Sequence, residues 1–438
     1  MAHFEIGLLF FGLTVVLILS RMPVGIAMFM MGGLGYSILV GWQPLLSTLN
    51  NSTYSRLADY NLSVIPLFIL MGQLATKAGL NQALFKAASA WFGHLRGGLA
   101  ISTIGGCAAF GAICGSSLAT AATMSQVAMP EMRRYNYSGA LITGTLAAGG
   151  TLGILIPPSV ILVIYAIYTE QSIGFLFLAA FIPGILATIQ YMIVVAIYVR
   201  IAPNSGPAVE RLPFREKMRA MRDVWPVLAV FLLVIGGIYQ GWFSPTEGAA
   251  IGSAAVGFFA FSIGKMRWRG FRACLVDTAE TTALIYLILI GTEIFNAFIA
   301  LTQMAGAVTE WIGGMGLPPL AILFMMLLIY LVLGCLMDSL AMVLLTLPVF
   351  IPILFSLDFG LTKEQTAIWF GILALVSVEV GMITPPFGLN IFVINAMSKS
   401  VPIQDTYVGV SGFVIADILR ITLLALFPAI SLIGAGLW

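Results

Sequence analysis

The chain has 438 residues, of which 60% are hydrophobic and 9% are charged, and its mean hydropathy is +1.04. Soluble domains carry about 25% charged residues, so this composition excludes an ordinary soluble protein and indicates an integral membrane protein. The apolar runs are long and continuous, whereas the strands of membrane barrels alternate apolar and polar residues. We therefore predict an all-α polytopic membrane fold with no nucleic-acid partner, and the formal net charge of +2 says little by itself.

Apolar segments follow one another along the whole chain, and a membrane-spanning helix needs about 20 apolar residues. They are found at residues 4–20, 24–41, 62–80, 97–130, 138–168, 173–200, 224–241, 245–263, 281–303, 317–356, 366–397 and 407–435. Segments 97–130 and 317–356 are too long for one span, and polar residues interrupt each near its middle, in CGSSLAT and LMDSLAM. Each is therefore predicted to be a helical hairpin that enters the membrane and turns back. Segment 4–20 is a full-length span rather than a cleavable signal.

Two proline pairs interrupt two of the longest apolar segments. Pro157 and Pro158 lie in GILIPPSV, where they remove two backbone donors and clash with the preceding turn. In hydrocarbon, a backbone group without a partner costs several kcal/mol. The pattern Gly-x-x-x-Pro-Pro recurs in GMITPPFG, and SSLA of the first hairpin aligns with DSLA of the second. Although a lone proline pair would also fit a structural kink, the recurrence predicts two repeats, at about 1–200 and 223–438.

The basic residues predict the orientation of the chain. Half of the 20 lysines and arginines lie between Arg200 and Arg272, in two clusters separated by a pair of spans. The clusters are Arg200, Arg211, Arg215, Lys217, Arg219 and Arg222, then Lys265, Arg267, Arg269 and Arg272. Positively charged loops stay in the cytoplasm, so loop 201–222 is predicted to be cytoplasmic and both termini periplasmic. The hairpins then enter from opposite sides, and inverted repeats with broken helices are typical of secondary transporters.

Helix ends inside the membrane are the predicted binding groups. Free N–H groups at helix N-termini attract anions, and free carbonyls attract cations. Hydroxyl and backbone oxygens suit Na⁺, which is a hard cation, and we predict two Na⁺ or substrate pockets, each made of one hairpin tip and one broken span. The first pocket comprises Gly115, Ser116, Ser117, Gly153, Pro157, Pro158 and Ser159. The second comprises Asp338, Ser339, Gly381, Thr384, Pro385, Pro386 and Asn390.

Several polar residues have two open interpretations. Ser116 and Ser117 would also fit hydrogen bonds to preceding helix carbonyls. Asp338 is the one acid at a hairpin tip, and a charge at such depth is a functional candidate, although a solvated loop acid fits the sequence too. Glu379, which aligns with Thr151, either lines the second pocket or pairs with a neighbouring helix.

No catalytic residue is predicted. Cys107, Cys114, Cys274 and Cys335 lack metal-ligand spacing and are interpreted as packing residues. The chain has no His-Glu-x-x-His motif, which excludes a zinc metalloprotease of that class, and no Gly-x-x-x-x-Gly-Lys-Ser/Thr motif for ATP hydrolysis. No organic cofactor is predicted.

The order of these motifs resembles the large membrane subunit of a tripartite ATP-independent periplasmic (TRAP) transporter. The resemblance is carried by the GSS tip, GxxxPPS, DSLAM and GMxTPPxGLN, and it covers essentially the whole chain. It implies a Na⁺-driven elevator carrier for small organic acids in the cytoplasmic membrane of a bacterium or archaeon. Its partners would be a periplasmic substrate-binding protein and a small four-helix membrane subunit, which we expect as a separate chain.

The resemblance also implies particular ion-site residues. The family's sites carry over onto Ser116, Ser117, Pro157, Pro158, Asp338, Ser339, Thr384 and Pro386. Phe387 stands where Ser159 stands in the first half, so the two pockets are expected to differ, and which of them binds the ion more strongly stays open.

We predict that the chain divides into a scaffold and a moving transport part. The scaffold is assigned to residues 1–60 and 223–280, the transport part to 61–200 and 281–438, and a cytoplasmic linker to 201–222. The alternative function is a one-component Na⁺-coupled carboxylate symporter of the same superfamily. An intramembrane aspartyl hydrolase would need two acids that face each other. Asp338 and Glu379 are the candidates for such a pair, but neither lies in a protease motif.

Overall fold

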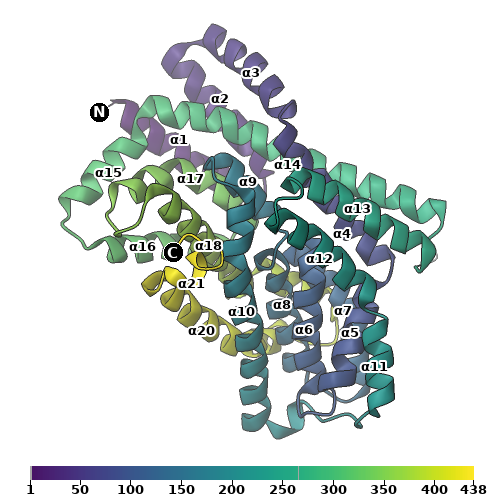
Figure 1. Cartoon of the computed structure of the whole chain (residues 1–438). Coiled ribbons are helices and arrows are strands. Elements are labelled where there is room, and N and C mark those ends of the chain that lie inside the picture. The colour runs from purple at the N-terminus through teal and green to yellow at the C-terminus, as the bar shows by residue number, and fades with distance from the viewer. Residues whose placement is uncertain (1, 265) are drawn as a thin grey trace.

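The computed structural model describes residues 2–264 and 266–438, and every regular element among them is a helix (Figure 1). Five of these helices are long and apolar enough to cross a membrane, or up to eight if each bent helix pair forms one span. The all-helical prediction is therefore confirmed. Lys265, which we assigned to a basic cluster, lies outside the described residues, as do the side chains of Ala2, Ser52, Thr53 and Arg56.

The helices occur in a similar order in the two halves of the chain. The first half contains α1 (Ala2–Leu19), α2 (Val24–Val40), α3 (Trp42–Leu57), η1 (Tyr60–Ser63), α4 (Val64–Lys77), α5 (Leu80–Phe92), α6 (Gly98–Cys114), α7 (Ser117–Arg134), α8 (Gly139–Leu155), α9 (Val160–Tyr168) and α10 (Ile173–Ile201). The second half contains η2 (Pro203–Ser205), α11 (Phe214–Arg222), α12 (Trp225–Tyr239), α13 (Pro245–Ser262), α14 (Trp268–Thr302), α15 (Met304–Gly314), α16 (Pro319–Gly334), α17 (Ser339–Ser356), α18 (Lys363–Ile383), α19 (Leu389–Met397), α20 (Ile403–Leu426) and α21 (Ala429–Leu432). In both halves a helix pair, a hairpin and an interrupted helix follow in that order.

Both predicted hairpins and both predicted helix breaks are present. Helices α6 and α7 pack against each other, as do α16 and α17, and the first turn is made by Gly115, whose φ is +64°. Glycine tolerates this left-handed conformation because it has no Cβ. The first broken span changes direction by 42° between α8 and α9, and the second is interrupted between α18 and α19.

Two predicted boundaries differ from the structure. The expected span at 62–80 ends at Lys77, and the chain turns through 64° into α5 at Gly79, which has φ +75°. The boundary predicted at residue 281 falls inside α14, an uninterrupted helix of 35 residues. Charged residues before residue 281 determine where the apolar segment begins. The helix itself begins earlier, at Trp268, because polar residues also make the backbone hydrogen bonds of a helix.

One group of helices is built around α14, which lies alongside α2 (Figure 1). A Cβ added at Gly25 would lie 2.8 Å from the carbonyl oxygen of Leu287, and one at Gly32 would lie 2.6 Å from the Cα of Phe295. Small residues let membrane helices approach this closely. Helix α4 packs against both α13 and α14, so these helices form one connected group.

A second group contains the hairpins and the broken spans. Helix α8 packs against α6, α7 and α20, and α18 packs against α16, α17 and α20, so elements from the two halves of the chain interleave. The most apolar 18 residues of α18 are 100% buried. Helix α18 is therefore surrounded by protein rather than by lipid, and the candidate site is built around it and α8.

Candidate ion and substrate site

The tip of the first hairpin lies directly against the first helix break. A Cβ added at Gly115 would lie 2.8 Å from the carbonyl oxygen of Pro158. A Cβ added at Gly153 would collide with the hydroxyl of Thr120 and would lie 2.7 Å from the carbonyl oxygen of Ser116. Only glycine allows backbones to approach so closely, so these glycines hold the hairpin and the broken span together.

Serine residues are the N-caps of α7 and α9, the helices that follow the hairpin tip and the helix break. The Ser116 hydroxyl accepts a hydrogen bond from the N–H of Ala119 (3.4 Å) at the start of α7. The Ser159 hydroxyl accepts one from the N–H of Leu162 (3.5 Å) at the start of α9. Each serine satisfies one N–H that the first helical turn leaves free. The remaining N–H groups of both first turns are the anion-attracting groups expected at such ends.

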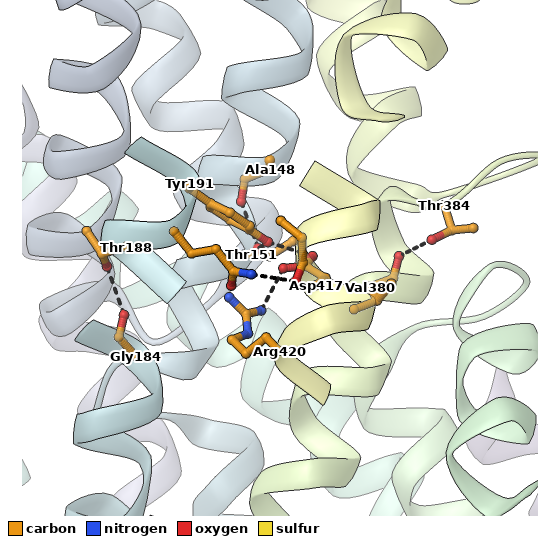
Figure 2. Close-up of polar contacts among 11 residues, drawn as sticks. Ala148, Thr151, Gly184, Thr188, Tyr191, Val380, Thr384, Asp417 and Arg420 are labelled. Atoms are coloured by element: carbon orange, nitrogen blue, oxygen red, sulfur yellow. Dashed lines mark hydrogen bonds and ion pairs between the residues drawn. The ribbon is translucent and has the colours of Figure 1, made fainter. Parts of the chain in front are cut away.

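The second hairpin tip carries an acid in the corresponding role. Asp338 Oδ2 accepts a hydrogen bond from the N–H of Leu340 (3.0 Å) at the start of α17. Below the tip, a Cβ added at Gly381 would lie 2.6 Å from the Cα of Gly334, so α16 and α18 also touch through glycines. At the end of α18, Thr384 donates a hydrogen bond to the carbonyl of Val380 (2.6 Å; Figure 2).

The two breaks differ in their exposure. Pro157, Pro158 and Ser159 are buried, whereas Pro385 and Pro386 are exposed. Beside these prolines, Phe387 is 50% exposed, so it does not fill the place of the buried serine in the first half. The peptide bond between the two prolines is cis in both breaks. The expected chemical difference between the pockets is thus accompanied by a difference in packing.

Asn390 lies with the first hairpin rather than with the second. Ser117 Oγ donates a hydrogen bond to Asn390 Oδ1 (3.3 Å), and Asn390 Nδ2 donates to the carbonyl of Ala147 (3.2 Å). We had grouped Asn390 with Asp338 because both belong to the second half of the sequence. The grouping differs because α19 packs against α7 and α8, and sequence order cannot show which hairpin a broken helix faces.

A cavity of about 690 Å³ lies between the two hairpin tips. Its lining from the predicted pockets comprises Gly115, Ser116, Ser117, Asp338 and Ser339. The opposite wall comes from the start of α2, from α4 and from the middle of α14. Asp338 is the one charged residue in the lining of this cavity. An anion in it would therefore be held by helix N-termini and neutral polar groups.

The other predicted residues do not line this cavity. They are Gly153, Pro157, Pro158, Ser159, Gly381, Thr384, Pro385, Pro386 and Asn390, and also Thr151 and Glu379. Glu379 is fully buried. Asp338 lines the cavity and Glu379 does not, and neither carboxylate oxygen of Glu379 has a hydrogen-bond partner among the described residues.

Four polar residues in the cavity lining were not among the predicted site residues. Gln73 and Thr76 of α4, Thr123 of α7 and Thr281 of α14 line the cavity. Gln73 and Thr76 interrupt an otherwise apolar helix, which is the signal that would have indicated them. Gln73 and Thr76 of α4 lie near Thr281 of α14 in the lining because these two helices pack against each other.

Comparison with known proteins assigns a family to this geometry. The sequence model described as "Tripartite ATP-independent periplasmic transporter, DctM component" matches residues 11–430. A C4-dicarboxylate TRAP transporter large permease protein from Pseudomonas aeruginosa is 34% identical over 85% of this chain and 86% of its own length. An ectoine TRAP transporter large permease protein from Halomonas elongata is 31% identical over 98% of this chain and 96% of its own length.

Further similarities concern another substrate and the fold. A sialic acid TRAP transporter large permease protein from Vibrio cholerae is 29% identical over 95% of both chains. The crystal structure of the YdaH transporter of Alcanivorax borkumensis has a TM-score of 0.64 and 15% identity, and it covers 96% of this chain and 98% of its own. That similarity shows a shared fold. The family match and these relatives show that the chain belongs to the tripartite ATP-independent periplasmic transporters, as their DctM component, the large permease subunit.

Proposed function

We propose that this chain imports a small organic acid by Na⁺ symport, using an elevator movement and a periplasmic substrate-binding protein. The observation that carries the proposal is the cavity between the two hairpin tips. The N-termini of α7 and α17 both reach this cavity, at Ser117 and Ser339. Helix N-termini favour carboxylates, and the relatives named above include permeases for C4-dicarboxylates and sialic acid.

The oxygen-rich helix ends behind the cavity would hold Na⁺. The first group combines the carbonyl of Pro158 with the hydroxyls and carbonyls around Ser116, Ser117 and Ser159; the second combines Asp338 with the carbonyl end of α18 near Thr384. Hydroxyl and backbone oxygens suit a hard cation, and their position at interrupted helices is that of coupling-ion sites in other secondary transporters.

The cavity also supports an inward-facing form with the predicted orientation. It reaches Pro23 and Thr76, which lie close in sequence to Arg21 and Lys77. Basic residues that flank spans stay in the cytoplasm. In this proposal the two halves are inverted repeats, both termini are periplasmic, and the cavity opens toward the cytoplasm.

The packing suggests a different division into scaffold and moving part from the one predicted. Because α14 is continuous and packs with α2, α4 and α13, the scaffold would contain all four helices together with α1 and α12. The transport part would contain the two hairpins, the two broken spans, α10 and α20. The small membrane subunit, as a separate chain, would brace the scaffold in the bilayer.

Reconstitution tests the proposal directly. The chain is placed in lipid vesicles with its small membrane subunit and binding protein, and uptake of labelled C4-dicarboxylate, sialic acid and ectoine is followed. We expect an inward Na⁺ gradient to accelerate uptake of at least one of them, and equal uptake without the gradient would refute Na⁺ coupling. Full uptake without the binding protein would favour the alternative, a one-component symporter.

Replacing Asp338 with asparagine is expected to weaken the Na⁺ dependence of uptake more than it weakens folding. Asparagine and aspartate are equally good N-caps, so the bond to the N–H of Leu340 is retained while the charge is lost. The measurement is the Na⁺ concentration that gives half-maximal uptake, which should rise, together with the melting temperature, which should change little.

The matched control for that variant is Asp358→Asn. The Asp358 side chain also accepts a hydrogen bond from a backbone N–H two residues later in the chain, that of Gly360 (2.9 Å). Unlike Asp338, it lies in an exposed loop. Its replacement should leave the Na⁺ dependence unchanged. Normal transport by the Asp338 variant would show that the Asp338 carboxylate does not bind the ion.

A further inference from the structure

The linker helix α11 carries two parallel rows of side chains that the rest of the described chain leaves exposed. Five of its nine residues are charged. Charged residues are costly inside a membrane, so this density of charge excludes α11 from the hydrocarbon of a bilayer. The helix nevertheless exposes three large apolar side chains. Its surface therefore differs both from that of a membrane span and from that of an ordinary polar loop helix.

One face of α11 packs against the rest of the protein. Lys217 and Ala220 are its buried residues, and the helix lies alongside α5 (Figure 1). Lys217 Nζ lies 5.5 Å from the centre of the Trp91 ring of α5, within the range of a cation–π interaction. This contact fixes the rotation of α11 about its own axis and so determines which of its faces point away from the protein.

A second face of α11 is an exposed apolar row. Phe214, Met218 and Met221 are four and three residues apart, so they share one side of the helix. They are 69%, 48% and 37% exposed, respectively. The row continues onto α5, because the Phe214 ring meets the ring of Trp91 edge-on, with 6.4 Å between ring centres, and Trp91 is itself exposed. A contiguous exposed apolar surface marks a site of contact with a protein or a membrane.

A third face of α11 is an exposed row of arginines. Arg215, Arg219 and Arg222 each follow one residue of the apolar row in the sequence. Successive residues lie about 100° apart around a helix, so the arginine row runs beside the apolar row along the whole helix. All three arginines are exposed, and none forms an ion pair with a described residue. Glu216, the one acid of α11, lies on another side of the helix.

The chain on either side holds α11 close to the membrane. It follows α10, which is long and apolar enough to cross a bilayer, and it precedes the apolar helix α12, whose axis is turned by 49° from that of α11. The segment before α11 is fixed to the end of α5 and the start of α6. The N–H of Gly97 donates to the carbonyl of Gly206 (2.8 Å), and the N–H of Val209 donates to the carbonyl of Gly93 (2.9 Å).

We propose that α11 binds the surface of the lipid bilayer, with its apolar row among the lipid chains and its arginine row on anionic phospholipid headgroups. The two rows require a ligand that is apolar over the length of the helix and negatively charged along one edge. The boundary between acyl chains and phosphates in an anionic leaflet has this arrangement, and guanidinium groups bind phosphate through two parallel hydrogen bonds. A protein partner would have to place acids at three successive positions beside an apolar groove.

This lipid contact is independent of the proposed Na⁺ coupling and of the transported substrate, because α11 contributes no residue to the cavity between the hairpin tips. It does bear on the first hairpin. Helix α5, which carries α11, also packs against α6 and α7. A lipid-bound α11 therefore holds the base of that hairpin beside the membrane surface.

Fluorescence of the complete transporter complex tests the proposal. Met218→Cys places a labelling site in the middle of the apolar row, and the four native cysteines are buried. The attached fluorophore emits at shorter wavelength in apolar surroundings. The complex is placed in nanodiscs of phosphatidylcholine alone or of phosphatidylcholine mixed with phosphatidylglycerol, which is anionic. We expect a shorter emission wavelength with phosphatidylglycerol, and high salt should weaken this shift because it screens exposed charges.

Replacing the three arginines of the row with glutamine should abolish the difference between the two lipids. The matched control replaces Lys86, Arg134 and Lys399 with glutamine. These basic residues are also exposed but lie outside α11, so the difference should remain. Equal emission in both lipids, or a difference that survives loss of the arginine row, would overturn the proposal. Equal short-wavelength emission in both lipids that is lost when the small membrane subunit is omitted would show that this subunit covers the apolar row instead.

Discussion

Replacing Gly115 with alanine is expected to reduce substrate uptake at least about tenfold, which corresponds to about 1.4 kcal/mol. Gly115 has φ +64°, where an L-residue costs about 1–2 kcal/mol. The added Cβ would also lie 2.8 Å from the carbonyl oxygen of Pro158. Because that oxygen belongs to the helix break, the hairpin tip would have to move away from it and distort the proposed ion site. Uptake into vesicles by equal amounts of folded protein provides the measurement.

Gly316 offers a matched control for this prediction. Its φ is also +64°, but no atom of the described residues lies within 4 Å of a Cβ added there. Gly316→Ala therefore introduces the same backbone strain without the collision and should transport at close to the wild-type rate. If both variants lose activity equally, backbone strain explains the loss and the contact between Gly115 and Pro158 has no part in transport.

Replacing Arg420 with methionine is expected to destabilise the protein by about 3–5 kcal/mol, because it leaves Asp417 as an unpaired buried charge. The two side chains are 2.9 Å apart and both are 0% exposed. The free energy of unfolding in detergent provides the measurement. The double variant Asp417→Asn with Arg420→Met should recover part of the loss, because it removes both charges.

An exposed pair with the same spacing along a helix serves as the control. Arg134 and Glu131 are also three residues apart, with 3.7 Å between their charged atoms, but their side chains are 73% and 38% exposed. Pairs of this kind contribute at most about 1 kcal/mol, so Arg134→Met should change stability little. A similar loss in both arginine variants would contradict the importance of burial for the Asp417–Arg420 pair.

Features that depend on the local backbone were predictable. Pro157 and Pro158 lack N–H groups and together remove two hydrogen bonds from the helix, which interrupts it, and Gly115 followed by two serines forms a turn and a helix N-cap. These effects act within a few residues, and the structure has both hairpins and both breaks where they were predicted.

Boundaries that depend on packing were less predictable. The start of an apolar segment suggested a division at residue 281, but α14 continues through that position. Hydropathy reports which residues prefer lipid or a protein core, whereas helix length follows from backbone hydrogen bonds that polar residues also make. Which helices move together depends on contacts such as those of α4 with α13 and α14.

The sequence by itself determined the all-helical class, the two hairpins, the two helix breaks and the motifs that indicated the transporter family. Only the tertiary structure decided that Asn390 binds Ser117, 273 residues away, and that both hairpin tips share one cavity with α4 and α14. It also decided that Arg420 pairs with Asp417 while Glu379 has no hydrogen-bond partner among the described residues. The physical reason is that backbone preferences are local, whereas the partner of a buried polar group is chosen by the packing of helices far apart in the chain.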